Sequence, residues 1–305
     1  MIKLNQLSGL ERRRRLCNNK LALRVGPFVY QVHSSLLELD DGLGTLYGDF
    51  EVVDCDSFVD FTVSVKRANP LSYLKGTADF YFDHQRPFTT FNIKNAYAFF
   101  EWGLNWCISV YPNEYLTLHA GVVAKEGRAT IFPGVPGAGK STLCAALGLA
   151  GWRVLSDEHA LIPPKTSTVV PVPRPVSLKN ESLEVIRRFS SGAVIGPPSG
   201  DTHKGRVAHL KSDLTADAHE RNPLPVHSMV FPQYSPTDEQ HLSRRSQTQS
   251  FVMAAFHSFN YSELGMEGFL TMRTLIDAVR CYDLVYRDLD WAIDTMEKLN
   301  VGMLR

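Results

Sequence analysis

The sequence predicts an α/β protein in two parts, a β-rich module over residues 1–115 and a mixed α/β domain over residues 116–305. Three observations support this division. The first part carries runs with the period-two alternation of half-buried strands, as in Phe61–Val65. A glycine-rich stretch at 134–142 lies between a β-prone run and a helical pattern. Beyond it, strand and helix patterns alternate to residue 299, as in α/β folds.

Strand patterns dominate the first part. Alternation predicts strands over 28–37, 50–53, 58–65 and 79–83. Residues 95–109 instead space their apolar side chains as a helix does, and we expect the aromatic ones in a core or an interface. The basic run Arg12–Arg15 is expected to be a solvated N-terminal segment.

The second part alternates strands and helices. Strands are expected over 115–124, 129–132, 152–156, 226–234 and 281–286. Helices are expected over 141–150, 180–189, 247–259, 266–279 and 289–299. The proline-rich stretch 161–177 is predicted to be an extended connection, and the glycine-rich stretch 190–206 a long loop that is either a functional lid or a linker.

Composition limits the functions that are open to the chain. Its 305 residues suit one large domain or two ordinary ones. The 32 basic and 32 acidic residues argue against general attraction to nucleic acid or anionic membrane. Five scattered cysteines form no Cys-x-x-Cys pair, and neither a membrane-length apolar segment nor a signal-peptide core is found. We therefore expect a cytoplasmic protein with free thiols and with no nucleic-acid or membrane partner.

The glycine-rich stretch fits the phosphate-loop pattern of Gly, four residues, Gly, Lys and Ser or Thr. Its glycines allow backbone amides to turn onto an anion, and the following helix directs its N-terminal dipole at the same place. The lysine would reach the outer phosphates, and the next hydroxyl would bind Mg²⁺. We therefore expect nine residues to bind a nucleotide: Gly134, Val135, Pro136, Gly137, Ala138, Gly139, Lys140, Ser141 and Thr142.

Two carboxylates follow this loop at a short distance. Asp157 and Glu158 lie 17 and 18 residues after Lys140, which leaves room for one helix and one strand. An acid at a strand end is typical of nucleotidases that bind Mg²⁺. An Asn-Lys-x-Asp base reader is absent, which argues against a switch GTPase. Leu7–Leu10 matches the transporter signature only in part and precedes the loop.

The stretch from His119 to Glu158 resembles HPr serine kinase/phosphorylase. It has a His-x-Gly strand start 21 residues before Lys140, and Gly151-Trp152-Arg153 leads into the acidic pair without insertion. The acidic run also resembles the related ATP-dependent phosphoenolpyruvate carboxykinases. The similarity covers about 40 residues. The chain looks most like the branch called HPr-kinase-related kinases (HprK-related kinase A).

This resemblance implies a P-loop-containing domain of the HPr-kinase/carboxykinase type and an ATP- and Mg²⁺-dependent kinase. The acceptor would be a Ser or Thr hydroxyl of a small protein or peptide, and the kinase a possible homo-oligomer. Lys140 would hold the phosphates, Ser141 and Asp157 would bind the metal, Glu158 would act as the general base, and His119 would support it.

The sequence departs from that family at several places. Glu158 stands where the family has Asp, which makes Asp157 the alternative base. The later Pro-Gly-Arg segment is missing, and Arg244 or Arg245 is the candidate for its arginine. Asp201 is the candidate for a further metal ligand, and Lys204 and Arg206 for a phosphate or substrate clamp.

Other interpretations stay open. A small-molecule kinase would use the same residues, and a catalytically decayed, ATP-gated binding protein would keep the loop without the transfer. Taken alone, His119 would be an ordinary strand histidine, and only its distance from Lys140 favours a functional role. Arg244 and Arg245 would otherwise begin a solvated helix, and His159 would lie beside the site or at the surface.

Overall fold

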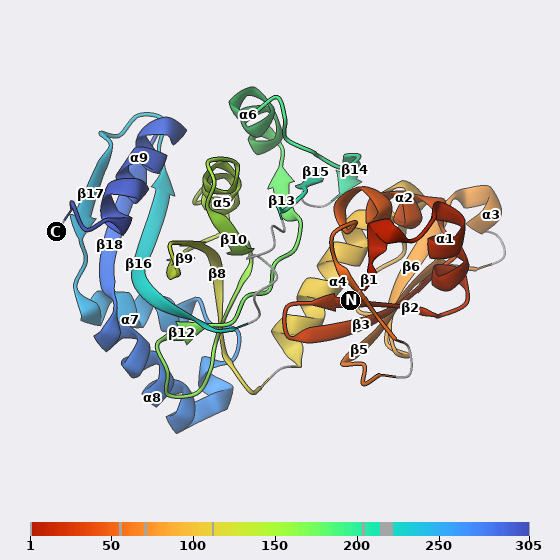
Figure 1. Cartoon of the computed structure of the whole chain (residues 1–305), viewed down its shortest axis with the longest axis horizontal. Coiled ribbons are helices and arrows are strands. Elements are labelled where there is room, and N and C mark those ends of the chain that lie inside the picture. Colours follow the sequence, from red (N-terminus) through yellow and green to blue (C-terminus); the bar gives the residue numbers. More distant parts are fainter. Residues whose placement is uncertain are drawn as a thin grey trace. The chain divides into compact units, whose positions relative to one another are not determined.

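The computed structural model describes residues 2–54, 57–69, 72–111, 113–202, 205–213 and 222–304, and in these its strands form three sheets with parallel and antiparallel pairs. The expected α/β class is confirmed. The chain divides into two compact units, which we describe separately (Figure 1). Unit 1 comprises Met1–Ile108, Ser177–Arg187 and Gly192–Leu214, and unit 2 comprises Ser109–Val176, Arg188–Ser191 and Thr215–Arg305. Two segments late in the chain therefore belong with the N-terminal strands.

Unit 1 is built on a seven-stranded sheet of order β1-β4-β2-β3-β5-β6-β7 and a three-stranded sheet of order β13-β15-β14. Its strands are β1 Ile2–Lys3, β2 Leu21–Val25, β3 Phe28–Ser34, β4 Glu51–Val53, β5 Phe61–Arg67, β6 Thr77–Phe82, β7 Phe91–Asn92, β13 Val176–Lys179, β14 Ser199–Thr202 and β15 Gly205–Leu210. Its helices are η1 Leu4–Gln6, α1 Gly9–Cys17, α2 Leu37–Leu46, α3 Ser72–Lys75, η2 Ile93–Asn95, α4 Ala96–Val110 and α6 Glu181–Phe189.

Helix α4 covers one face of the large sheet because its apolar residues are buried almost all round. The Tyr30 hydroxyl on β3 donates to the Leu104 carbonyl at 3.4 Å. A Cβ at Gly103 would lie only 2.1 Å from the Phe80 ring on β6, so the helix approaches the strand closely where the side chain is absent. The helix expected over 95–109 is confirmed within one residue at each end.

Several elements of unit 1 differ from the sequence prediction. The basic run lies on helix α1: Arg13 and Arg14 are exposed, as expected of a solvated segment, whereas Arg12 forms an ion pair with the largely buried Asp40 at 2.7 Å. Strand β2 and helix α2 were not predicted. The stretch 190–206 contains strand β14 and the start of β15 instead of one long loop.

Unit 2 has an eight-stranded sheet whose main order is β10-β8-β9-β16-β18-β17, with β11 beside β8 and β12 beside β16. Its strands are β8 Leu116–Lys125, β9 Arg128–Pro133, β10 Arg153–Ser156, β11 His159–Ile162, β12 Thr168–Val169, β16 Leu224–Tyr234, β17 His241–Arg244 and β18 Arg280–Tyr286. Its helices are α5 Lys140–Leu149, α7 Gln247–Phe256, α8 Tyr261–Ala278 and α9 Leu289–Asn300.

Helices cover both faces of this sheet, and the three central strands β9, β16 and β18 run parallel. One apolar cluster joins strand residues such as Val122 to Met272 and Leu275 of α8. The other joins Val123 to Leu143 of α5 and Met296 of α9. Neighbouring residues of β8 thus face opposite layers, as the period of a strand requires.

Candidate active site

The glycine-rich loop connects β9 to α5, as the sequence predicts. β9 ends at Pro133 and α5 begins at Lys140. Gly134, Gly137 and Gly139 have φ values of 154°, 88° and 91°, which residues with a Cβ adopt only under strain. The ammonium group of Lys140 donates to the carbonyls of Gly134 and Val135 at 2.6 and 2.9 Å, so the lysine lies inside the loop that precedes it.

Two tyrosines that the sequence analysis did not single out form hydrogen bonds to carbonyl groups of the glycine-rich loop. The Tyr286 hydroxyl, at the end of β18, donates to the Gly139 carbonyl at 3.0 Å. The Tyr234 amide, at the end of β16, donates to the Ala138 carbonyl at 3.1 Å. Burial raises the pKa of Tyr286. The loop is therefore anchored at the carboxyl ends of two parallel strands, where α/β sheets commonly bind ligands.

The two carboxylates are positioned by the register between β8 and the strands after α5. Ser156 pairs with Val122 and His159 pairs with His119, so Asp157 and Glu158 fill the gap between two strand pairings. The Ala120 amide donates to the Glu158 carbonyl at 3.1 Å and holds the chain together there. The Ser156 hydroxyl accepts from the amides of Glu158 and His159 at 3.3 and 2.9 Å, which stabilises the bend.

This register brings His119 to Glu158. The Nε2 atom of His119 lies 3.5 Å from Oε1 of Glu158, and about a quarter of each side chain is exposed. The main-chain amide of His119 donates to the His257 carbonyl at 2.7 Å. The Phe259 ring lies 5.7 Å from the His119 ring. The histidine is thus held by the segment after α7, and its ring remains accessible beside the carboxylate.

Asp157 is 4% exposed and lies near the loop helix. The pKa of the Cys144 thiol on α5 is sensitive to both groups. Burial raises this pKa, the negative charge of Asp157 raises it further, and the positive charge of Lys140 lowers it. A Cβ at Gly121 would lie 2.5 Å from the Cys144 sulfur, so α5 packs tightly on β8 at this point. The acid and the loop lysine therefore act on the same buried thiol.

His159 is fully buried, which contradicts the expected surface position but agrees with the alternative place beside the site, since it pairs with His119. Its Nε2 atom lies 2.8 Å from the Ser109 hydroxyl. Burial lowers its pKa to about 3, and the nearby cation of Arg174 lowers it too. Arg174, itself 2% exposed, was missed because its proline-rich surroundings indicate only an extended chain.

His257 is the other site residue that sequence reasoning missed. It is 8% exposed and follows helix α7 directly. Burial lowers its pKa, and the positive charges of Lys140 and His119 lower it further. The histidine therefore lies near both the glycine-rich loop and the His119–Glu158 pair, although 117 residues separate it from Lys140 in the sequence. No motif marks its position, so only the tertiary structure reveals it.

The two candidate arginines contact β18. Arg245 pairs with Asp283 at 2.6 Å and its guanidinium lies 4.6 Å from the centre of the Phe231 ring, so it is not solvated as the sequence suggested. Arg244 ends strand β17 and its guanidinium lies 5.2 Å from the centre of the Tyr282 ring. The Asp201 side chain and Lys204 lie outside the described residues, and Arg206 pairs with Glu184 at 3.2 Å.

A preformed metal cage of protein ligands is not found: among the described residues, no three or more His, Cys, Asp and Glu side chains cluster to hold an ion. The Ser141 hydroxyl and the Asp157 carboxylate remain the candidate ligands, which suits Mg²⁺ because it commonly takes one or two protein oxygens together with phosphate. No described helix is both long and apolar enough to cross a membrane.

No family model matches the chain, and a search of curated proteins finds no match.

Proposed function

We propose that this chain is an ATP- and Mg²⁺-dependent kinase of the HPr-kinase/carboxykinase type, which transfers the γ-phosphoryl group to a Ser or Thr hydroxyl of a small protein or peptide. The proposal rests on one observation, namely that three candidate groups lie close together in unit 2. A phosphate loop ending in Lys140, a buried Asp157 and an accessible His119–Glu158 pair all gather around strand β8 and the first turns of α5.

The loop fits a triphosphate. Its three glycines have backbone angles that keep Cβ atoms out of the cradle, and helix α5 begins there with its N-terminal amides. Lys140 would exchange its two carbonyl contacts for phosphate oxygens. Bound Mg²⁺ would neutralise the phosphates, with Ser141 and Asp157 as its protein ligands.

The carboxylates fit a division of roles. Asp157 is buried beside the loop helix, which suits a group that orients a cation. Glu158 is partly exposed, and its carboxylate is within reach of an incoming hydroxyl. Glu158 would accept the hydroxyl proton as that oxygen attacks the γ-phosphorus, the bond to the β-phosphate oxygen breaks, and ADP leaves. His119, 3.5 Å away, would orient the carboxylate.

The acceptor class needs a direct test. The full chain is incubated with Mg²⁺ and γ-labelled ATP, in parallel with a degenerate pool of Ser- and Thr-containing peptides and a pool of hydroxylated metabolites. Label in the peptides supports the proposal. Label in a metabolite alone would make the chain a small-molecule kinase, and ATP binding with no transfer to either pool would favour the ATP-gated binding protein.

Two variants identify the residues responsible. Lys140→Ala should abolish Mg²⁺–ATP binding measured by calorimetry, because the loop loses its cation, whereas the exposed Lys298→Ala should bind as the wild type does. Glu158→Gln should keep ATP binding and lose transfer, with the exposed Glu263→Gln as the matched control. Transfer at the wild-type rate in Glu158→Gln would contradict its role as the base.

A further inference from the structure

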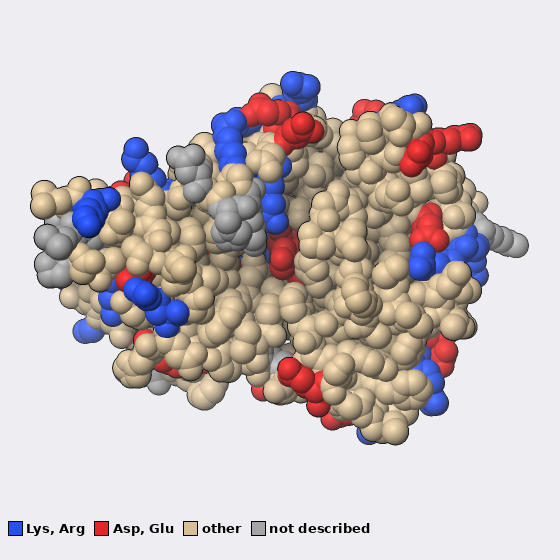
Figure 2. Space-filling model, turned by 180° about the vertical axis from the view of Figure 1, so that it is seen from behind, with Lys and Arg blue, Asp and Glu red and all other residues tan. Residues whose placement is uncertain are grey.

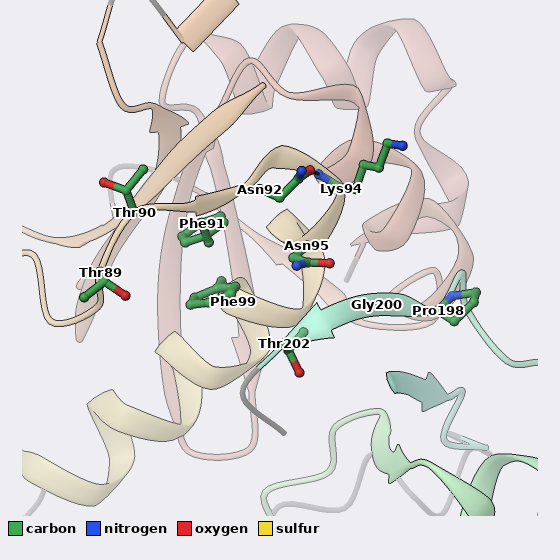
Figure 3. A pocket seen from close by; sticks show the side chains of 10 residues that line it. All are labelled: Thr89, Thr90, Phe91, Asn92, Lys94, Asn95, Phe99, Pro198, Gly200 and Thr202. Carbon is green, nitrogen blue, oxygen red and sulfur yellow. Dashed lines mark hydrogen bonds between the residues drawn. The ribbon is translucent and has the colours of Figure 1, made fainter. Parts of the chain in front are cut away.

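Unit 1 has a pocket between the free edges of its two sheets. Strand β7 is the last strand of the large sheet, and β14 is the last strand of the small one. A cavity of about 510 Å³ lies between them, lined on one side by residues 89–92, Lys94, Asn95 and Phe99 and on the other by Pro198, Gly200 and Thr202 (Figure 3). This volume is within the usual range for ligand pockets. No phosphate-loop residue lines it.

Asn95 contributes a polar side-chain amide to the lining of the pocket. It is 5% exposed and lines the cavity, and in Figure 3 it lies between Phe99 and strand β14. Within the described part of the chain, no hydrogen bond engages its side-chain amide. Its amide atoms are not among the buried side-chain atoms that lack a partner, which is consistent with an amide that faces the cavity, and a primary amide both donates and accepts. A main-chain peptide group offers the complementary acceptor and donor.

The two strand edges favour the same kind of partner. Among the described residues, β14 pairs with β15 alone and β7 with β6 alone, so the outer edge of each has no described strand beside it. An extended peptide satisfies such an edge by adding a strand, while pockets along the edge select its side chains. Gly200 lines the cavity without a side chain and leaves the β14 backbone accessible.

The residues that line the cavity also indicate which side chains a bound peptide would carry. Phe91 and Phe99 stack with their ring centres 3.8 Å apart and form an apolar floor. Lys94 is the single charged residue among the ten that line the cavity, and none of the ten is acidic. Lys94 forms no ion pair with a described residue. The pocket therefore suits an apolar side chain next to a carboxylate.

We propose that this pocket binds an extended polypeptide segment that carries an Asp or Glu beside an apolar residue. Its peptide groups bond to Asn95 and to an exposed strand edge, and its carboxylate pairs with Lys94. The proposal deepens the kinase function and rests on it in one respect, namely that the bound segment belongs to the phosphate acceptor. Peptide binding itself requires no nucleotide.

The test starts without ATP. A library of random twelve-residue peptides is displayed on phage and selected on the full chain, and the enriched peptides are synthesised for fluorescence anisotropy. We expect Asp and Glu to be enriched and Pro to be depleted along the contact. N-methylation of alternate peptide amides should weaken binding about tenfold or more, because each removes a main-chain donor.

Variants of the chain localise the site. Asn95→Leu and Lys94→Glu should each weaken the enriched peptides about tenfold or more, and selection on Lys94→Glu should favour Lys or Arg. Lys20→Glu reverses an exposed charge of unit 1 outside the cavity and should leave affinity within about twofold. The peptides must also bind Lys140→Ala, which tests this pocket independently of the kinase site. If Asn95→Leu fails to fold, the affinity of Lys94→Glu for the enriched peptides still tests whether this pocket binds them.

Each result has one meaning. Absence of enrichment, or peptides that bind Lys94→Glu as tightly as the wild type, would overturn the pocket even if the chain transfers phosphate. If the peptides bind as expected but no phosphoryl transfer occurs, the peptide-binding proposal is supported and the kinase proposal is rejected. If both hold, a Ser-containing enriched peptide should show a raised KM and an unchanged kcat in Lys94→Glu.

Discussion

The contact between Tyr286, at the end of β18, and Gly139 predicts how much a side chain at position 139 would destabilise the glycine-rich loop. A Cβ at Gly139 would lie 2.3 Å from the Tyr286 hydroxyl and 3.1 Å from the Tyr234 Cβ, at a φ of 91°. A residue with a Cβ pays about 1–2 kcal/mol for a left-handed backbone. Losing the hydrogen bond from the tyrosine costs about 1 kcal/mol more. We therefore expect Gly139→Ala to lower the free energy of unfolding by about 2–3 kcal/mol.

The matched control is Gly137→Ala. Gly137 has a similar φ of 88° but has nothing within 4 Å of its Cβ position, so only the backbone strain of about 1–2 kcal/mol should appear. In a Tyr286→Phe background, the hydroxyl is gone and the hydrogen bond is already lost. Gly139→Ala should then cost about 1 kcal/mol less than it does in the wild type, which gives a coupling of about 1 kcal/mol between Gly139 and Tyr286, and the contact of its Cβ position with the Tyr234 Cβ at 3.1 Å remains.

Urea unfolding, followed by circular dichroism and by hydrogen exchange in α5, measures these differences. Distant sites add within about 0.3–0.5 kcal/mol, which sets the threshold. A coupling smaller than about 0.5 kcal/mol would refute the inference that the tyrosine fixes the loop. Calorimetry with Mg²⁺–ATP on the same variants should show weaker binding for Gly139→Ala than for Tyr286→Phe, because only the former distorts the cradle itself.

Asp157→Asn should lower the Mg²⁺-dependent turnover rate by about 100-fold or more, while an unchanged circular dichroism spectrum shows that the fold is intact. Full activity would contradict the proposed place of Asp157 beside the metal. Glu158→Gln should lower kcat by about 10²–10⁴-fold with the KM for ATP unchanged in steady-state assays, and a raised KM with an unchanged kcat would point to a binding role instead. His159 binds its proton near pH 3 when folded but near 6.5 when unfolded, so stability that is present above pH 6.5 is lost as the pH falls towards 3. The loss reaches about 1.4 kcal/mol per pH unit, and His159→Gln should lack it in unfolding experiments across that range. Gly103→Ala should destabilise unit 1 by about 1–3 kcal/mol because its Cβ would meet a phenylalanine ring at 2.1 Å, whereas Gly9→Ala, with open space around it, should not; equal melting temperatures would refute the close approach.

Charge on the molecular surface agrees with the composition. The face drawn in Figure 2 shows basic and acidic side chains interspersed over broad areas that carry neither. The chain has a formal net charge of zero. Lys94 is therefore notable for its setting in a cavity without acidic lining, because its charge is not balanced by the other residues that line that pocket.

The sequence alone determined the local features that depend on a few neighbouring residues. Gly134 to Thr142 specify a turn and a helix start, because glycine backbone freedom and the helical pattern act over a short range. The spacing from Lys140 to Asp157 likewise admits one helix and one strand, and the structure contains these two elements. The alternating runs of residues 61–67 and 116–125 became strands for the same reason.

Only the tertiary structure decided which distant residues meet. His119 faces Glu158 because β8 runs antiparallel to β10 and β11 in one particular register, and the bend at Asp157 lies between the two pairings. His257 and Tyr286 reach the loop from elements more than 100 residues away, without a motif that marks them. Strand β15 pairs with β13 and β14 to form a sheet in unit 1 that local propensity did not indicate. Strand pairing and helix docking depend on burial summed over the whole unit, which no short stretch of sequence contains.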